Sequence, residues 1–516
     1  MSWTRREFMM TGALASLSLP LIGGCQKKAE PVAATQEIIQ PTVVSNKPSY
    51  FENHFGVTPE MIDKVLAKTM SRGGSFGDLF FEHTKNGSVR MRNGKVTEAS
   101  SGVALGMGAR CVNKDQVGYA YSESFELEDM LRAGEAAASI APGKESVEIK
   151  PRHDVDIERY YSQAADWNVF DVSKAVALVQ KIESQARAKS ADIIEVTVLM
   201  QWNQRNIMIN TSDGINAEDR QPIYRLWITM VMKRGDERQS NMAGYGAKAD
   251  FESITQRIID DLVNEVYVNT EILFHSVRPK AGEWPIVLEA GEAAILLHEA
   301  IGHGLEADFN RKDLSIFSSK LNQRVASDEV TIGDSGIVRD SYGAYNIDDE
   351  GHACEDTLLV ENGILRGYLH DRISADHYHL KSTGNGRRES YKHKPIPRMR
   401  VTYMKNGPHE KEELLDGIKY GIYCSTFTNG VVNIGQGDYT FYMKNGYLIE
   451  DGKLTTPIKD VNLIGNGPDT LSKIDMVANN YKCDTCPGYC GKNNQMVPVT
   501  FGMPSIRVTH ITVGGV

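Results

Sequence analysis

The sequence predicts an α+β protein with two domains, an N-terminal α/β sandwich and a β-rich C-terminal domain around one buried helix. The chain has 516 residues, which is more than one ordinary hydrophobic core accommodates. Helical and strand-like periodicities alternate as far as residue 277, and a polar break follows at residues 278–283. Gly-rich, strand-like segments then dominate to Val516. We therefore expect the N-terminal domain at 49–277 and the C-terminal domain at 282–516.

The N-terminal domain is expected to pack helices against hairpin-linked strands. Its helices are predicted at residues 58–68, 127–140, 171–189 and 251–268. Its strands are predicted at residues 78–82, 88–92, 95–97, 102–112, 193–202, 206–210 and 223–233. Thr58 and Pro59 are typical of a helix N-terminus, and Asn93-Gly94 is typical of a hairpin turn. This order favours a mixed or antiparallel sheet. The sequence of this domain has no Rossmann or P-loop glycine motif. We therefore expect the domain to cover a substrate site and not to bind a nucleotide.

The overall charge argues against a nucleic-acid partner. Asp and Glu (67) outnumber Lys and Arg (57), and the formal net charge is −10. Non-specific binding of nucleic acid depends on clustered Lys and Arg, whereas this chain has only short basic pairs such as Arg387-Arg388. A composition of 41% hydrophobic and 24% charged residues is ordinary for a soluble globular protein. We therefore expect a soluble enzyme that does not bind nucleic acid.

The first 25 residues resemble an export signal. Residues Thr4–Met9 resemble a twin-arginine motif, and an apolar stretch follows at residues 10–24. That stretch is too short and too rich in Gly and Ser for a transmembrane helix, which needs about 20 apolar residues. Residues Leu21–Cys25 also resemble a lipobox with one mismatch, and residues 26–48 suit a linker. We expect a bacterial protein that is exported, and is periplasmic or a lipoprotein tethered to the membrane through Cys25; the alternative is a signal with an incidental cysteine.

The cysteines do not form a disulfide scaffold, because seven in a chain of this length are too few and too unevenly spaced. Three of them cluster near the C-terminus at Cys483, Cys486 and Cys490. Cys483 and Cys486 form a C-x-x-C motif. Three interpretations of this motif are open: a small structural zinc site, a disulfide, or no functional role.

The C-terminal domain begins with a predicted strand at residues 284–288 and a predicted helix at residues 291–305. This helix carries His298, Glu299 and His303 among Ala, Ile and Leu residues. Imidazole ligands beside a carboxylate that acts on zinc-activated water are the chemistry of zinc peptidases. However, the spacing is H-E-x-x-x-H, which separates the histidines by about 140° around a regular α-helix.

A π-turn would bring both histidines back to one face of the helix. Gly302 and Gly304 make such a distortion easier, so we predict a π-bulge or a helix break between His298 and His303. The alternative is that the histidines are satisfied core residues beside a hydrogen-bonded Glu299. Three ionisable groups on an apolar helix are costly to bury without a compensating charge, and this favours a divalent metal.

A catalytic zinc ion usually has three protein ligands, so a third residue must come from elsewhere. Glu306 and Asp308 are near in sequence. The C-terminal cysteines offer a softer ligand that zinc prefers. From the residues alone, both sources are open.

The segment from His298 to Arg311 resembles the TldD-type members of the TldD/PmbA family, also called modulator of DNA gyrase proteins. The resemblance continues through segments spread over the C-terminal domain: Glu361–Leu365, Thr383–Tyr391, Gly446–Glu450, Leu463–Pro468, Cys490–Lys492, Gln495, Val497–Val499 and Thr512–Gly515. The N-terminal domain fits the family more loosely.

The resemblance implies a zinc-dependent peptidase with His298, His303 and Cys490 as metal ligands and Glu299 as general base. PmbA-type members lack the H-E-x-x-x-H motif, so its presence implies the catalytic type. Family members act on small or unfolded peptides in a site enclosed between the domains, usually with a partner subunit. We therefore expect a homodimer or a heterodimer with a PmbA/TldE-like subunit. The export signal departs from the cytoplasmic members, and Cys483 beside Cys486 suggests a redox-sensitive site.

The expected reaction is peptide hydrolysis, in which zinc polarises the carbonyl and activates water while Glu299 passes the water proton to the leaving amine. Arg387, Arg388, Tyr391 and His370 are candidates for binding substrate as further oxyanion donors, and an exposed surface role is the alternative for each. A rival function is a non-catalytic, metal-stabilised partner or regulatory subunit of a peptidase complex, which a closed zinc site would favour. Gyrase modulation by DNA contact is a third possibility, against which the acidic balance argues.

Overall fold

The computed structural model describes residues 48–143 and 147–515, which all belong to one unit, Thr42–Val516. The predicted signal, nearly all of the predicted linker and Cys25 lie outside the described residues. No helix within the described ranges is long and apolar enough to cross a membrane. The described residues combine helices with large, mainly antiparallel sheets, which confirms the predicted α+β class.

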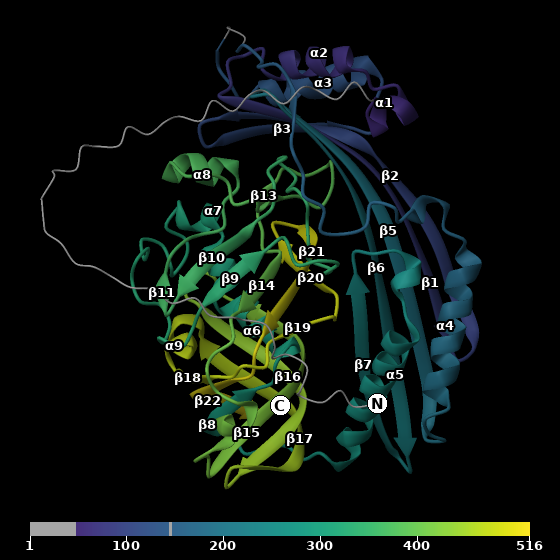
Figure 1. Cartoon of the computed structure of the whole chain (residues 1–516), viewed down its shortest axis with the longest axis vertical. Coiled ribbons are helices and arrows are strands. Elements are labelled where there is room, and N and C mark those ends of the chain that lie inside the picture. The colour runs from purple at the N-terminus through teal and green to yellow at the C-terminus, as the bar shows by residue number, and fades with distance from the viewer. Residues whose placement is uncertain (1–47, 144–146, 516) are drawn as a thin grey trace, which may run out of the picture. The chain divides into compact units, whose positions relative to one another are not determined.

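The N-terminal half forms one seven-stranded sheet in the order β3-β2-β1-β5-β6-β4, with β7 paired to β6. The long strands are antiparallel, and only the short β4 runs parallel to its neighbour. Figure 1 shows β1, β2, β5 and β6 as long curved strands side by side. The bounds are β1 Phe76–Arg92, β2 Lys95–Asn113, β3 Gln116–Ser122, β4 His153–Asp154, β5 Ile193–Thr211, β6 Ile215–Arg234 and β7 Glu237–Ala247.

Helices cover one face of this sheet. Alternate residues of a strand point to one face, and Phe81 packs with the first helices while Val89 packs with the later ones. Thr58 caps the second helix as predicted, by accepting the amide N–H of Met61. The helices are α1 Tyr50–Phe55, α2 Pro59–Thr69, α3 Leu127–Ala138, α4 Val172–Arg187 and α5 Gln256–Glu271.

The opposite face of the sheet packs against the C-terminal half. Phe80 points to this face, where it clusters with Tyr391. Arg110 of β2 is fully buried and forms ion pairs with Asp78 and, at 2.8 Å, with Glu350. The two halves of the chain therefore share an apolar contact and a buried ionic network.

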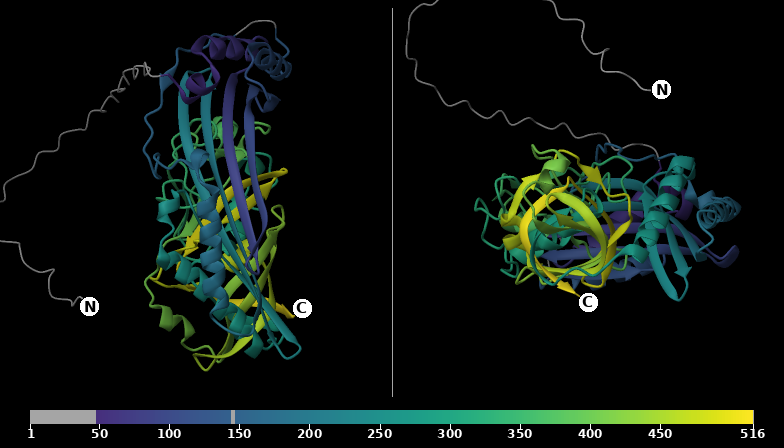
Figure 2. Two further views of the ribbon diagram at one scale, coloured as in Figure 1. Left: turned by 90° about the vertical axis from the view of Figure 1, so that its right-hand side faces the viewer. Right: turned by 90° about the horizontal axis from the view of Figure 1, so that it is seen from below.

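The C-terminal half contains a barrel. Its strand order is β17-β16-β15-β8-β22-β18, and a further pairing between β17 and β22 closes the sheet. The view from below in Figure 2 shows this ring of strands. The bounds are β8 Gly282–Leu288, β15 Tyr420–Val432, β16 Asp438–Glu450, β17 Lys453–Asn466, β18 Ile474–Val477 and β22 Ile506–Gly515.

The C-terminal half also contains a second seven-stranded sheet, which shares the hydrophobic core of the barrel. Along the sequence, the strands of this sheet come between groups of barrel strands. Its order is β11-β10-β9-β14-β21-β19, with β20 paired to β21. Its bounds are β9 Ile332–Ser335, β10 Asp356–Glu361, β11 Ile364–Leu365, β14 Val401–Met404, β19 Lys482–Cys483, β20 Gly488–Lys492 and β21 Gln495–Met503. The remaining elements are α6 Ile295–Leu297, α7 Ala307–Asn310, α8 Arg372–Tyr378, α9 Gly467–Ser472, β12 Gly386–Arg387 and β13 Ile396–Pro397.

Three predicted strand breaks in the N-terminal sheet are wrong. Residues 78–82 and 88–92 belong to one strand, as do residues 95–97 and 102–112, and residues 193–202 and 206–210. Gly87 of β1 pairs with Trp202 of β5, and a Cβ atom on Gly87 would lie 2.3 Å from the indole ring. The glycine therefore admits a large side chain from the neighbouring strand and does not end its own strand.

Candidate metal centre

The predicted helix at residues 291–305 consists of short consecutive turns of different helical types. In order, these are a 3-10 turn, an α-helical turn, a π-helical turn and a second 3-10 turn, at Glu292–Ala294, Ile295–Leu297, His298–Gly302 and His303–Leu305. The segment is therefore helical from Glu292 to Leu305 but changes its helical type along its length, and the π-bulge predicted between the two histidines is confirmed.

Two glycines allow close packing around this turn. A Cβ atom on Gly302 would lie 2.1 Å from the sulfur of Met399. One on Gly304 would lie 2.6 Å from the Phe317 ring. Larger residues would therefore push these neighbours away from the π-turn.

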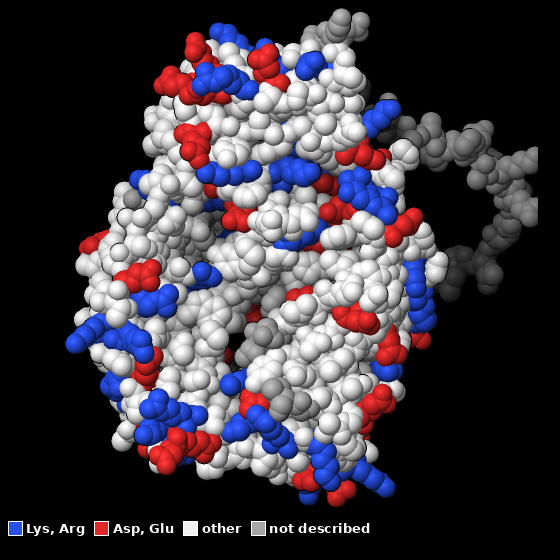
Figure 3. Space-filling model, turned by 180° about the vertical axis from the view of Figure 1, so that it is seen from behind, with Lys and Arg blue, Asp and Glu red and all other residues white. Residues whose placement is uncertain are grey.

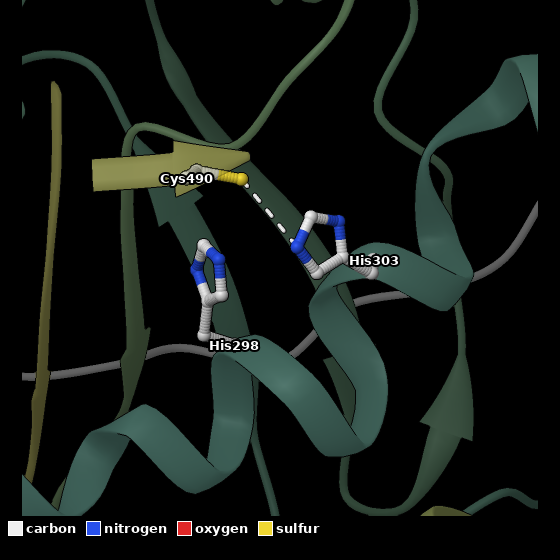
Figure 4. A group of neighbouring side chains, drawn as sticks. All are labelled: His298, His303 and Cys490. Carbon is white, nitrogen blue, oxygen red and sulfur yellow. Dashed lines mark hydrogen bonds between the residues drawn. The ribbon is translucent and has the colours of Figure 1, made fainter. Parts of the chain in front are cut away.

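His298, His303 and Cys490 converge on one point, although Cys490 lies 187 residues after His303. One ring nitrogen from each imidazole and the Cys490 sulfur all lie within 4.8 Å of one another. The Cys490 Sγ atom is 3.4 Å from Nε2 of His303, and the two imidazole centroids are 4.7 Å apart. Figure 4 shows the sulfur and both rings grouped around a common centre. All three side chains are buried.

The position of Cys490 depends on strand pairing and on a buried arginine. Cys490 lies in β20, opposite Val497 of β21. The fully buried Arg398 donates hydrogen bonds to the carbonyl oxygen of Cys490 and, at 3.2 Å, to that of Gln495. These contacts hold the two strands together at the point where the thiol meets the histidines.

The three side chains change one another's protonation. Burial raises the pKa of the Cys490 thiol, but His298 and His303 more than offset it, so this pKa falls well below 9.0. Burial lowers the pKa of His303, but Glu306 and Cys490 more than offset it, so this pKa rises well above 6.5. The site therefore favours a thiolate, the form of cysteine that binds metals.

Glu306 contacts the ring nitrogen of His303 that is not directed at Cys490. Its Oε2 atom lies 2.9 Å from Nδ1 of His303, and the Lys492 ammonium lies 3.2 Å from the same oxygen. Burial raises the pKa of Glu306, but Lys492 and His303 more than offset it, so the pKa falls to about 2. A carboxylate in this position orients an imidazole ligand and leaves its other nitrogen for a metal.

The sequence neighbours considered as a third ligand have other partners. Glu306 contacts the far nitrogen of His303, and Asp308 accepts a hydrogen bond from Lys492 at 2.6 Å. Cys483 and Cys486 carry free thiols, and the group of converging ligand atoms includes Cys490. The geometry thus favours the C-terminal cysteine over the acidic residues.

His298 and Glu299 line a cavity of about 320 Å³. Its other walls include Trp227 of β6, Met242 of β7 and Phe427 of β15, so the N-terminal sheet covers it. Burial raises the pKa of the Glu299 carboxyl, and His298 and His303 offset only part of this effect. A carboxyl group with a raised pKa in a cavity is typical of a catalytic base.

The four predicted oxyanion donors Arg387, Arg388, Tyr391 and His370 are all buried, so the alternative of an exposed surface role is wrong for each. Within the described part of the chain, the lining of the Glu299 cavity includes none of them. Burial lowers the pKa of His370 to about 4. Their binding of substrate stays a prediction.

A second group of potential ligands is already occupied by donors from the protein. Asp348, Glu350 and His352 bring their ligand atoms within 4.8 Å of one another. However, Asp348 accepts the amide N–H groups of Glu350, His352 and Gly386. Glu350 pairs with Arg110 and accepts the amide N–H of Arg372. These carboxylate oxygens stabilise the fold, although Nδ1 of His352 has no hydrogen-bond partner among the described residues.

Comparison with known proteins gives matches along most of the chain. The PmbA/TldA metallopeptidase domain 1, central domain and C-terminal domain match residues 77–141, 166–271 and 281–515. The metalloprotease TldD homolog of Buchnera aphidicola is 34% identical over 447 residues, which cover 85% of this chain and 92% of that protein. The chain belongs to the PmbA/TldD metallopeptidase family. The family predicted from the motifs is thereby confirmed.

A more distant relative and two solved structures are also similar to this chain over most of its length. The zinc metalloprotease TldD homolog of Saccharolobus solfataricus is 26% identical, with coverage of 88% of this chain and 99% of that protein. A putative modulator of DNA gyrase from Thermotoga maritima matches with a TM-score of 0.72 and 19% identity, covering 88% of this chain and 99% of the other. TldE from Thermococcus kodakarensis matches with a TM-score of 0.69 and 17% identity, covering 88% and 100%.

Proposed function

We propose that the chain is a zinc-dependent peptidase that hydrolyses small or unfolded peptides, with His298, His303 and Cys490 as zinc ligands and Glu299 as general base. The observation that carries this proposal is the convergence of three buried ligand atoms beside a carboxyl-lined cavity. Membership of a metallopeptidase family supports a metal at this site.

The residues fit zinc. Imidazole nitrogen and thiolate sulfur are both ligands that zinc takes, and three protein ligands leave the fourth position that a catalytic zinc site needs. One ring nitrogen of His298 lies within 4.8 Å of the other two ligand atoms, and no residue of the described chain forms a hydrogen bond with its Nδ1. When bound, zinc supplies Lewis acidity that polarises a peptide carbonyl and acidifies water.

The protein's own part of the reaction depends on Glu299. Its carboxylate accepts a proton from a water molecule in the cavity and delivers it to the amine nitrogen as the peptide bond breaks. Glu306 and Lys492 keep His303 in the required orientation during this step. The covering sheet admits extended or short peptides and excludes folded proteins, because the cavity is about 320 Å³.

The rival functions have less support. A closed structural zinc site would need a fourth protein ligand, and the group of converging atoms contains three residues. A gyrase modulator that contacts DNA would need a basic surface. On the face shown in Figure 3, acidic and basic side chains are interspersed.

We further propose that the chain works with a second copy or with a PmbA/TldE-like partner. The fold shared with TldE supports a pair built from two chains of one fold. Export by the twin-arginine signal, with Cys25 as a lipid anchor, is likewise a proposal from the sequence.

Removal and return of the metal tests the proposed function. We expect a chelator to abolish cleavage of unstructured peptides and stoichiometric zinc to restore it, because the three residues leave one position for chemistry. Cleavage is measured by mass spectrometry of the products. Full activity of the zinc-free protein would refute a metal-dependent reaction, and zinc binding without any cleavage would favour the non-catalytic partner.

Glu306→Gln is expected to weaken zinc binding by about 10- to 100-fold, the usual effect of changing a group that supports a metal ligand. The amide cannot replace the carboxylate opposite His303 and Lys492. Competition with a chromophoric chelator measures the affinity. The matched control is Glu361→Gln, which removes an exposed pair with Arg366 and should leave zinc affinity unchanged. Equal affinities for both variants would show that Glu306 does not support the site.

A further inference from the structure

A second cavity, of about 200 Å³, lies between the N-terminal sheet and the C-terminal half. Arg205, Lys248, Tyr345 and Arg388 contribute to its walls. Tyr489, the residue before Cys490, lines both this cavity and the one at Glu299. A peptide that passes Tyr489 would therefore reach from one cavity to the other.

Lys248 has a buried side-chain nitrogen that forms no hydrogen bond within the described residues. It directly follows β7, and its amide N–H donates to the carbonyl of Asp340 at 3.0 Å. The residue is 1% exposed, and its Nζ atom has no hydrogen-bond partner within the described residues. Nζ lies 3.0 Å from the ring centroid of Tyr345 and 5.1 Å from that of Tyr161. Burial and then Arg387 lower the pKa of Lys248 well below 10.5, and Asp219 offsets only part of this effect.

A second buried cation shares the Tyr345 ring. The guanidinium of Arg387 lies 4.1 Å from the ring centroid. It donates hydrogen bonds to neutral oxygens, the carbonyls of Met399 and Pro498 and the hydroxyl of Tyr345. The basic side chains of Lys248 and Arg387 thus meet at one aromatic ring.

The acidic residues around the cavity have partners other than Lys248, and two of them, Glu82 and Asp349, pair with Arg205 of the cavity wall. Glu82 accepts hydrogen bonds from the Thr84 hydroxyl and the Tyr391 amide. Glu389 accepts the amide N–H of Met496 at 2.7 Å. Asp349 pairs with Arg205 at 3.0 Å and accepts the amide N–H of Arg388.

Asp219, which lies behind the cavity, is also engaged. It pairs with Arg159 at 3.0 Å and accepts hydrogen bonds from Tyr161 and Asn346. Asp219 therefore acts on Lys248 only through its charge, and the Lys248 Nζ atom has no hydrogen-bond partner among the described residues.

An unpaired buried ammonium is unfavourable. Contact with an aromatic ring stabilises a cation by less than the cost of desolvating the charge. The cavity has room for several water molecules, each of which occupies about 30 Å³ in the liquid. Guanidinium and ammonium groups together are the usual donors for carboxylates and phosphates.

We propose that this cavity binds an oxyanion, with Lys248 as its counter-charge and Arg205 and Arg388 at its walls. The oxyanion is the C-terminal carboxylate of a bound peptide or a small free oxyanion of the same chemistry. The carboxylate form rests on the proposed peptidase function, because the peptide would extend past Tyr489 from the Glu299 cavity. Oxyanion binding itself does not depend on that function.

The first test is calorimetric titration of the zinc-loaded, full-length protein with inorganic phosphate at constant ionic strength. We expect Lys248→Met to weaken phosphate binding by about 10-fold or more, because a charge-assisted hydrogen bond is lost. The matched control is Lys68→Met, which removes an exposed pair with Glu135 and should bind phosphate as the wild type does. Lys248→Gln, which keeps a polar end without charge, serves if the methionine variant does not fold.

The second test compares two peptides that differ only in a C-terminal acid or amide. A lower KM for the acid in the wild type, lost in Lys248→Met, would identify the substrate carboxylate as the occupant. Equal KM values with phosphate binding that depends on Lys248 would identify a free oxyanion. Both results support the site.

Phosphate affinity that is unchanged in both Lys248 variants would overturn the proposal. Phosphate that binds only at zinc would give this same result, and it would therefore also overturn the proposal. A wild type that cleaves neither peptide would reject the proposed function, and the phosphate titration would still decide the oxyanion site. Thermal unfolding without phosphate adds a further check. A purely structural Lys248 would destabilise the protein when replaced, whereas loss of an unpaired charge should not.

Discussion

Glu299→Gln is expected to lower kcat/KM for peptide hydrolysis by about 10²- to 10⁴-fold, the range that a general acid–base group contributes. The amide has nearly the shape of the carboxylate but cannot accept the proton of water. Zinc content should equal that of the wild type, because Glu299 is not among the three converging ligand residues. Steady-state kinetics with an unstructured peptide, together with metal analysis of the same sample, measure both quantities.

The control for this variant is Glu283→Gln, the same change at an exposed position of β8, which should keep wild-type kinetics. If Glu299→Gln retained more than about a tenth of the activity with full zinc, another group would have to be the base. The pairing of lost activity with retained metal is therefore the specific signature of the assigned role.

Cys490→Ala is expected to weaken zinc binding by more than about 100-fold and to abolish peptide cleavage at limiting zinc. Replacement of a supporting residue already costs about 10- to 100-fold in affinity, so loss of a ligand itself should cost more. The cavity left by the thiol lies between His298 and His303, whose rings stay on the π-turn. Chelator competition and cleavage assays at graded zinc concentrations measure the two effects.

Cys483→Ala is the matched control, since Cys483 carries a free, half-buried thiol seven residues earlier in the same segment. It should keep wild-type zinc affinity. Equal loss of zinc in both variants would point to a cluster of cysteines as the metal site and would contradict the assignment to Cys490 alone.

The break in the metal-binding helix could be predicted because it follows from angular spacing. Residues His298 and His303 cannot share a metal on a regular α-helix, and the glycines beside them permit a π-turn. The structure has that turn. Rules of local geometry were sufficient here because both ligands lie within six residues.

The third ligand and its surroundings could not be predicted from local rules. Cys490 reaches the histidines through the pairing of β20 with β21, and the residues alone left Glu306 and Asp308 as alternatives. The roles of Lys492 and Arg398 went unrecognised for the same reason. Lys492 contacts Glu306 across the fold, and nothing in its immediate neighbourhood in sequence indicates burial.

Arg387 and Arg388 show a further limit of sequence patterns. Two adjacent arginines suggest an exposed basic pair or a substrate contact, yet both are buried. Arg388 pairs with Asp78 of β1, 310 residues earlier. The direction of a side chain at a contact between two halves depends on partners that only the folded chain brings together. The prediction divided the long strands β1, β2 and β5, because the full length of a strand depends on the neighbours with which it pairs. Gly87 of β1, for example, accommodates Trp202 of β5.

X-ray absorption at the zinc edge tests the three-residue site most directly. The wild-type protein should show one sulfur at about 2.3 Å and nitrogen ligands at about 2.0–2.1 Å. Cys490→Ala should lose the sulfur contribution, and Cys483→Ala should retain it. A wild-type zinc shell made of nitrogen and oxygen alone, or a sulfur contribution that survives in Cys490→Ala, would contradict a metal centre built from His298, His303 and Cys490.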